Sequence, residues 1–198
     1  MIEFGAMKVL LGILLGILIV ALAVLLVFAT GSWNIAASVA PGRLESKIAL
    51  FAATRSIEKR APNKTNPASG PATLRAGLGH FKENCVMCHG APGVPEAELG
   101  MGLNPPAPDL TLPQIQKMTD GQLFWVVQNG IRMTGMPAFG PTHSEQQLWQ
   151  IVAFIRHLPE LTAAEQQVLK AGMEEEQEHH EEGGEKPAPD AKPAAPKS

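Results

Sequence analysis

The two cysteines of this chain, Cys85 and Cys88, are separated by two residues and followed directly by His89. They stand in a region, residues 72–165, that offers few segments from which to build an apolar core. A small domain of this kind usually needs a covalent crosslink, a metal or a cofactor to be stable. The chemistry of the Cys-Val-Met-Cys-His segment therefore limits what this region can fold into.

Three kinds of site use such a segment or part of it. A structural zinc site takes four ligands, and three neighbours in sequence leave that set incomplete. A thioredoxin-like dithiol belongs to an α/β pattern, whereas no run here alternates as a strand would. The third is covalent haem attachment, in which each thiol adds to a porphyrin vinyl group and the histidine binds the iron. The segment favours haem, and cysteines with a structural role alone remain an alternative.

An apolar segment stands near the N-terminus, and its 22 residues from Val9 to Thr30 include no charge. As a helix it would span ~33 Å, which matches a bilayer core of about 30 Å. A cleaved signal peptide usually has a shorter apolar region, of about 7–15 residues. We therefore expect residues 1–31 to be a retained transmembrane signal-anchor, with cleavage as the alternative. Gly12 and Gly16 have the spacing that lets two such helices pack together, although glycine is common in membrane helices.

Basic residues are concentrated just after this segment. Residues 32–70 carry six Lys or Arg and two acidic residues, whereas 71–165 and 166–198 have net charges of −3 and −4. By charge alone, the side that follows the anchor would lie in the cytoplasm. The body of the protein lacks the basic surface of a nucleic-acid-binding protein, so we expect no nucleic-acid partner.

Residues 32–71 are interpreted as a basic juxtamembrane segment and linker. Leu44, Ile48 and Phe51 share one face of a predicted helix, as in a short amphipathic helix lying on a lipid surface. A solvated helical spacer is an equally good alternative. The proline-rich residues 61–72 are predicted to be a linker that lets the following domain swing.

Residues 72–165 are predicted to be a small all-α domain. A first helix over 72–84 leads into the cysteines. A middle helix begins at Thr119 and a last helix at Ser144, each with a glutamine three residues later that fits a capping box. Residues 166–198 are acidic and rich in proline and alanine, with little to bury, and they predict a disordered tail. His179 and His180 in that tail are interpreted as solvated.

A methionine downstream is the natural second iron ligand if the histidine after the cysteines is the first. Met136 stands in a Gly-Met-Pro loop, where glycine permits a close turn and proline fixes the backbone. Met118 and Met133 are interpreted as ordinary core side chains. His80 and His143 are interpreted as surface histidines.

Residues 74–159 resemble a class I cytochrome c. The resemblance rests on the segments CVMCHG, NPPAPDL and GMPAFG and on a terminal helix LWQIVAFIRHL. It implies one covalently bound haem c, with Cys85 and Cys88 as thioether donors and His89 and Met136 as axial ligands of the iron.

The resemblance also implies two supporting contacts. The carbonyl of Pro108 should accept a hydrogen bond from Nδ1 of His89 and so orient its ring. Gly77, Phe81 and Phe154 should form the crossing of the first and last helices. The expected fold is thus a small class I cytochrome c domain between a transmembrane helix and a disordered tail.

Because that family receives its haem outside the cytoplasmic membrane, the resemblance implies a single-pass inner-membrane protein whose haem domain faces the periplasm. That outweighs the charge signal. An iron with two axial ligands has no open position for a substrate. We therefore expect not an enzyme but a carrier of single electrons between a redox protein donor and acceptor, in a respiratory or photosynthetic chain, free or as a subunit of a respiratory complex. The alternative is a five-coordinate haem protein that binds gases or reduces peroxide.

Overall fold

The structure is a computed structural model that describes residues 2–183, with side chains for residues 5–174. It divides into two units between Val39 and Ala40. All the regular elements among the described residues are helices, accompanied by one isolated bridge between Ala91 and Val94. The predicted all-α class is confirmed.

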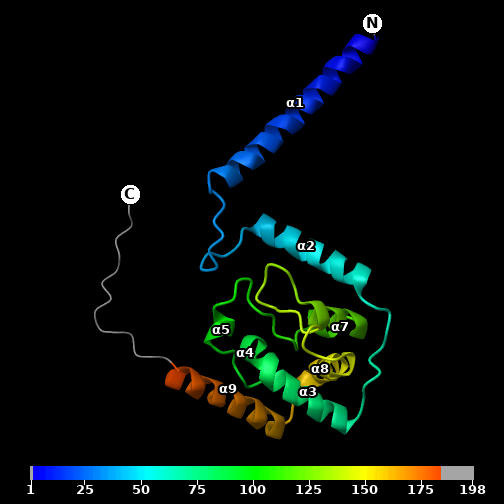
Figure 1. Cartoon of the computed structure of the whole chain (residues 1–198). Coiled ribbons are helices and arrows are strands. Elements are labelled where there is room, and N and C mark those ends of the chain that lie inside the picture. The colour runs from blue at the N-terminus through cyan, green and yellow to red at the C-terminus, as the bar shows by residue number, and fades with distance from the viewer. Residues whose placement is uncertain (1, 184–198) are drawn as a thin grey trace, which may run out of the picture. The chain divides into compact units, whose positions relative to one another are not determined.

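The first unit contains α1, Ile2–Ala29, the long blue helix of Figure 1. Its stretch Gly5–Ala29 has a mean hydropathy of 3.3, and none of it is buried. At about 1.5 Å per residue this stretch is ~37 Å long, enough to cross a bilayer core of about 30 Å. The predicted single N-terminal apolar helix is confirmed.

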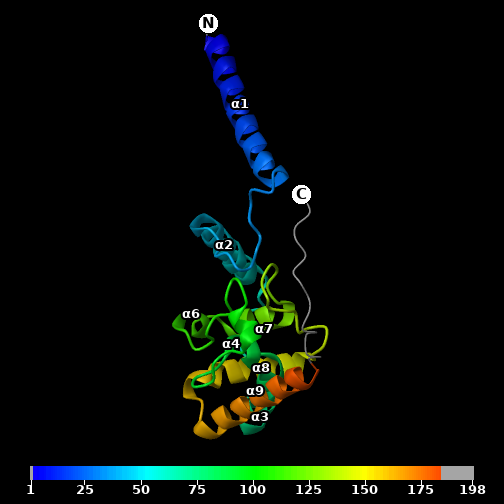
Figure 2. The ribbon, with the colours of Figure 1, turned by 90° about the vertical axis from the view of Figure 1, so that its left-hand side faces the viewer.

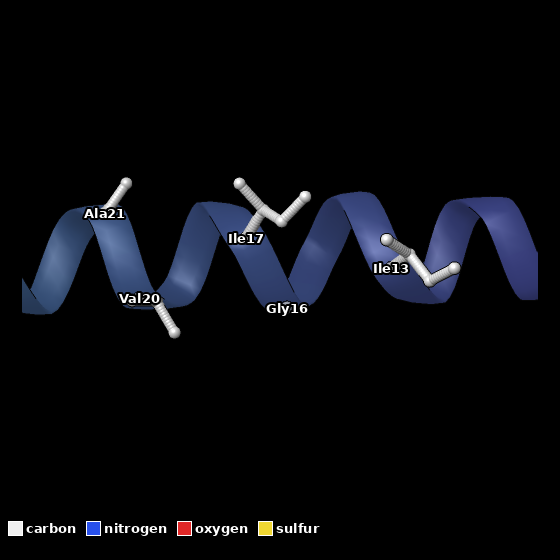
Figure 3. A pocket seen from close by; sticks show the side chains of 5 residues that line it. All are labelled: Ile13, Gly16, Ile17, Val20 and Ala21. Carbon is white, nitrogen blue, oxygen red and sulfur yellow. The ribbon is translucent and has the colours of Figure 1, made fainter.

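One side of α1 carries a shallow groove at Gly16, where a side chain is missing (Figure 3). The groove is lined by Ile13, Gly16, Ile17, Val20 and Ala21. Nothing lies within 4 Å of the place that a Cβ on Gly16 would take.

The second unit is built on the crossing of α3, Pro71–Asn84, and α8, Glu145–His157 (Figures 1 and 2). A Cβ on Gly77 would lie 2.3 Å from the carbonyl oxygen of Gln150 and 2.8 Å from the Cβ of Phe154. Only glycine allows the two backbones to come this close. The rings of Phe81 and Phe154 pack beside this contact with their centroids 5.3 Å apart, and both are fully buried.

Capping boxes open α7, Asp120–Asn129, and α8, as the sequence predicts. At α7, the hydroxyl of Thr119 accepts the backbone N–H of Gln122, whose side chain in turn accepts the N–H of Thr119. Ser144 and Gln147 make the same reciprocal pair at α8. Two otherwise unsatisfied N–H groups are bound at each helix start, which fixes where each helix begins.

Three short helices lie between α3 and α7, and they carry the loops around the cysteines. They are α4, Val86–His89, α5, Glu98–Met101, and α6, Pro113–Gln116. A Cβ on Gly100 would come within 2.7 Å of the carbonyl oxygen of Met87, so α5 packs closely on α4. A 3-10 turn, η1, Leu158–Glu160, ends α8.

Arg156 connects α8 to α6 and to the start of α7. Its Nε donates to Oδ1 of Asp120 at 2.9 Å, its Nη1 donates to the carbonyl of Gln116 at 2.6 Å, and its Nη2 donates to the carbonyl of Met118. The two charged side chains are only 28% and 20% exposed. A partly buried pair whose donors are all satisfied stabilises one arrangement of α6, α7 and α8.

A helix over Arg43–Arg60, α2, contacts α7, and the chain after it stays on the domain. The N–H of Asn66 donates to Oδ2 of Asp120 and its side-chain amide donates to the carbonyl of Trp149, both at 2.9 Å. The carbonyl oxygen of Pro62 lies 1.8 Å from where a Cβ on Gly121 would be. Residues 61–72 were expected to be a swinging linker. The structure differs, because these contacts hold the segment against α7 and α8.

The chain after η1 forms α9, Ala163–Gly183, which packs on α3 and α4 (Figures 1 and 2). Leu169 is fully buried and Met173 is 8% exposed. The structure therefore differs from the predicted domain end at residue 165 and from a tail disordered over its first part, residues 166–183. The apolar contact that holds α9 rests on Leu169 and Met173, two side chains four residues apart, just before an acidic run that begins at Glu174. The part of the tail from 184 onward lies outside the described residues, as do the side chains of His179 and His180.

Gly77→Ala should lower the free energy of unfolding by about 3 kcal/mol, because the added methyl group overpacks the helix crossing. Gly79→Ala is the matched control in the same helix, since nothing lies within 4 Å of its added Cβ. It should raise stability by up to about 1 kcal/mol, the helix propensity gained. Urea unfolding of the two holoproteins measures the difference. Equal effects would contradict the close contact at residue 77.

Leu169→Ala should cost about 3 kcal/mol, because it removes a fully buried side chain from the contact between α9 and the core. The neighbouring Val168 is 43% exposed, and Val168→Ala should cost less than about 1 kcal/mol. Thermal unfolding of both variants compares them. A Leu169→Ala variant as stable as the parent would show that residues beyond 165 do not pack on the domain.

Candidate functional site

The two cysteines lie where α3 ends and α4 begins. Cys85 breaks the helix with φ −120°, and its carbonyl then accepts the N–H groups of Cys88 and His89 at 3.1 and 2.9 Å. The tight turn presents both thiols and the imidazole from one short segment. Neither cysteine forms a disulfide.

The sulfur of Cys85 is buried, and burial is the main reason that the pKa of its thiol rises to about 12, with nearby Cys88 adding to the effect. A buried thiol of this kind disfavours a free thiolate, which a reactive dithiol requires. A neutral thioether carries no charge and suits this surrounding. Among the described residues, no cluster of three or more His, Cys, Asp or Glu is arranged to hold a metal ion. The zinc alternative thus gains no support.

One ring nitrogen of His89 is held by a backbone carbonyl. Its Nδ1 lies 2.8 Å from the carbonyl oxygen of Pro108, rather than that of Pro105 or Pro106, and donates to it as the N–H tautomer. Burial lowers the pKa of His89, although the bond to Pro108 opposes the effect. The ring is therefore neutral with Nε2 available as a ligand, the state that iron coordination needs.

Two side chains that the sequence analysis did not single out fix the loop around Pro108. Oδ1 of Asp109 accepts the N–H and hydroxyl of Thr111 at 2.8 and 2.7 Å. Nε2 of Gln116 donates to the carbonyls of Leu110 and Ile155 at 2.8 and 2.9 Å, which ties the loop to α8. An aspartate before a Leu-Thr pair in a proline-rich loop is a signal for such a turn. The reach of Gln116 to α8 has no local signal.

Met136 lies on the loop that leaves α7. That loop begins at Gly130 with φ 63°, and the carbonyl of Met136 turns back to accept the N–H of Ile131 at 3.3 Å. The N–H of Met136 is bound by the hydroxyl of Thr134 at 3.2 Å. Its side chain is half-buried and packs against the apolar core. Hydrogen bonds of both its N–H and its carbonyl thus fix the backbone of Met136.

The other methionines take different positions. Met118 packs against the core as expected. Met133, expected in the core, is instead 91% exposed and has a positive φ of 62°. Its place in a left-handed turn of the loop directs it outward. Met101 is 65% exposed.

His80 and His143 lie together, with their ring centroids 5.3 Å apart. Nδ1 of His143 is also 2.9 Å from the hydroxyl of Thr142. Burial, followed by the charge of His143, lowers the pKa of His80, while Glu83 opposes the shift. Both histidines are half-buried, where surface positions were expected.

The donor set fits haem c. It offers two closely spaced thiols for the vinyl groups, one neutral imidazole nitrogen and one thioether sulfur, which are the groups that haem c attachment and axial coordination use. The half-buried apolar side chains that pack on the core include Met87, which stands between the two cysteines in sequence, and Leu110, two residues after Pro108.

The family model described as "Cytochrome C oxidase, cbb3-type, subunit III" matches residues 72–155. This region is a class I cytochrome c domain. It binds haem c covalently and serves electron transfer. No curated protein matches the chain. The matched region begins within α3 and ends within α8, so α1, α2 and α9 are additions to the cytochrome c domain.

Cys88→Ser should leave haem attached to the cytochrome c domain through Cys85 alone, because each thiol adds to one vinyl group. The alkaline pyridine spectrum of the reduced variant should then move to longer wavelength, between the c-type and b-type products. The double variant Cys85→Ser/Cys88→Ser is the control, and acidified organic solvent should extract all of its haem. An unchanged pyridine spectrum in Cys88→Ser would contradict a thioether at that residue.

Proposed function

We propose that this protein is a membrane-tethered cytochrome with a single haem c, which carries single electrons between redox proteins at the cytoplasmic membrane. The observation that carries the proposal is the hydrogen bond between Nδ1 of His89 and the carbonyl of Pro108 within a cytochrome c domain. It leaves Nε2 as the coordinating atom and raises the basicity of the ring.

In this proposal, Cys85 and Cys88 would hold the haem through thioether bonds, and His89 and Met136 would bind its iron. When bound, haem c supplies a centre that gains or loses one electron. The chain's own part is to fix both axial ligands and exclude water. Both ligands are neutral, and with the apolar surroundings they favour the reduced, less charged state. No open coordination position remains for a substrate.

Several features support membrane attachment and the side on which the domain works. The helix α1 is apolar and long enough to span a bilayer. Since the family receives haem outside the cytoplasmic membrane, the cytochrome c domain faces the periplasm and the N-terminus lies inside. Tethering raises the concentration of the domain beside membrane-bound partners.

The description of the matching family points to one kind of partner. It names subunit III of a cbb3-type oxidase, so a terminal oxidase complex is the first acceptor to test, with this chain as a subunit or as a separate carrier. Purification in mild detergent followed by identification of the associated proteins distinguishes the two roles.

Met136→Ala should open one axial position of the iron. The ferrous variant should bind carbon monoxide, the ferric variant should lose the weak long-wavelength band of methionine sulfur on haem, and the reduction potential should fall. Met133→Ala is the matched control three residues away, because that side chain is 91% exposed, and it should leave all three properties unchanged.

Optical spectra and a redox titration measure these effects. A parent protein that already binds carbon monoxide, together with an unaltered spectrum in Met136→Ala, would refute ligation by Met136. That result would favour a five-coordinate haem protein that binds gases or reduces peroxide.

A further inference from the structure

The outward side of α2 carries three large apolar side chains that none of the described residues of the second unit covers. Leu44 is 72% exposed, Ile48 is 59% exposed and Phe51 is 69% exposed. They lie at spacings of four and three residues, and therefore on one face of the helix. A contiguous apolar face of this kind on an otherwise folded unit usually marks an interaction surface.

The opposite side of α2 is the one that belongs to the domain. Ala53, Ser56 and Ile57 are half-buried, and α2 contacts α7. The chain after the helix is fastened by the two hydrogen bonds of Asn66. The helix is thus already held by one side, and its outer apolar face contributes nothing to that packing.

The charges of α2 indicate which kind of partner its outer face would bind. The helix carries five basic residues, Arg43, Lys47, Arg55, Lys59 and Arg60, and two acidic ones, Glu45 and Glu58. Two arginines are bonded within the helix: Arg55 pairs with Glu58 at 2.9 Å, and Nη1 of Arg60 donates to the carbonyl and hydroxyl of Ser56. The long stems of lysine and arginine can lie along an apolar surface while their charges reach anionic headgroups. Apolar side chains with a positive surplus match anionic phospholipid.

The position of α2 in the chain supplies the second argument. Residues 30–42 separate it from α1, and thirteen residues extend at most about 45 Å. The start of α2 therefore stays within about 45 Å of the end of α1, which keeps a membrane surface within its reach. The intervening segment adds further exposed apolar side chains, among them Trp33 at 43% and Ile35 at 91%.

We propose that α2 lies along the surface of an anionic phospholipid bilayer, with Leu44, Ile48 and Phe51 inserted and its basic residues among the headgroups. Since its other side is fixed to the cytochrome c domain, this contact sets the orientation of the domain over the membrane. The proposal rests on the proposed role of α1 as a membrane anchor.

The test uses the holoprotein in lipid nanodiscs that hold one chain each. The haem thioethers occupy both native cysteines, so one introduced cysteine is the only thiol available to a bimane fluorophore. The probe sites are Ile48→Cys and Phe51→Cys. The matched control is Ala49→Cys, on the same helix, exposed, and turned by roughly 100° from residue 48. Ala21→Cys reports separately on α1.

Doxyl-labelled lipid should quench the bimane at residues 48 and 51 at least about twofold more than at residue 49, because a face of this kind sinks about 5–10 Å into the interface. Aqueous iodide should show the reverse order. The difference should be larger in discs with phosphatidylglycerol than in discs of phosphatidylcholine alone.

Three outcomes overturn the proposal. Iodide access at 48 and 51 with lipid quenching at 21 would place α2 in water and leave the anchor intact. No lipid quenching at 21 would remove the anchor as well. Protection of 48 and 51 from both quenchers would mean that protein covers this face.

Discussion

The close approach of α3 and α8 at Gly77 is the contact on which the rest of the cytochrome c domain depends. Because Gly77 has no side chain, the backbone of α8 comes near enough for Phe81 and Phe154 to fill the core beside it. The end of α3 runs directly into the segment that carries Cys85, Cys88 and His89, while the loop that carries Met136 enters α8. The crossing thus determines where both candidate ligand segments begin.

A second set of contacts converts this crossing into a fixed site. Arg156 joins α8 to the start of α7 and to the end of α6, and Gln116 joins α8 to the loop of Pro108. The imidazole of His89 is therefore held through a chain of hydrogen bonds that ends on the same helix as the crossing. Such networks fix the orientation of a coordinating side chain.

Sequence reasoning reaches the parts of this arrangement that have local signals. Three of these signals act within a few residues, and the structure has the corresponding helices. They are the capping pairs at Thr119 and Ser144, the spacing of Gly77 and Phe81, and the cysteine segment. Distant partners have no such signal. That Asn66 pairs with Asp120 depends on a side chain 54 residues away, and an aspartate in the first turn of a helix is equally explained by the helix dipole. The outward position of Met133 depends on a left-handed turn, which its own residue type disfavours.

Two helices outside the matched region contact the helices that lead to the two candidate ligand segments, the cysteine segment and the loop of Met136. The helix α9 packs on α3 and α4, which carry the cysteines and His89, and α2 contacts α7, from which the loop of Met136 departs. Because residues 61–70 are held against the domain, residues 30–42 are the segment that allows the domain to reorient relative to α1. If α2 rests on lipid as proposed, the bilayer limits that freedom further. A domain held in few orientations meets a membrane-bound partner with the same face each time. A larger share of the encounters is then productive than tethering alone would give.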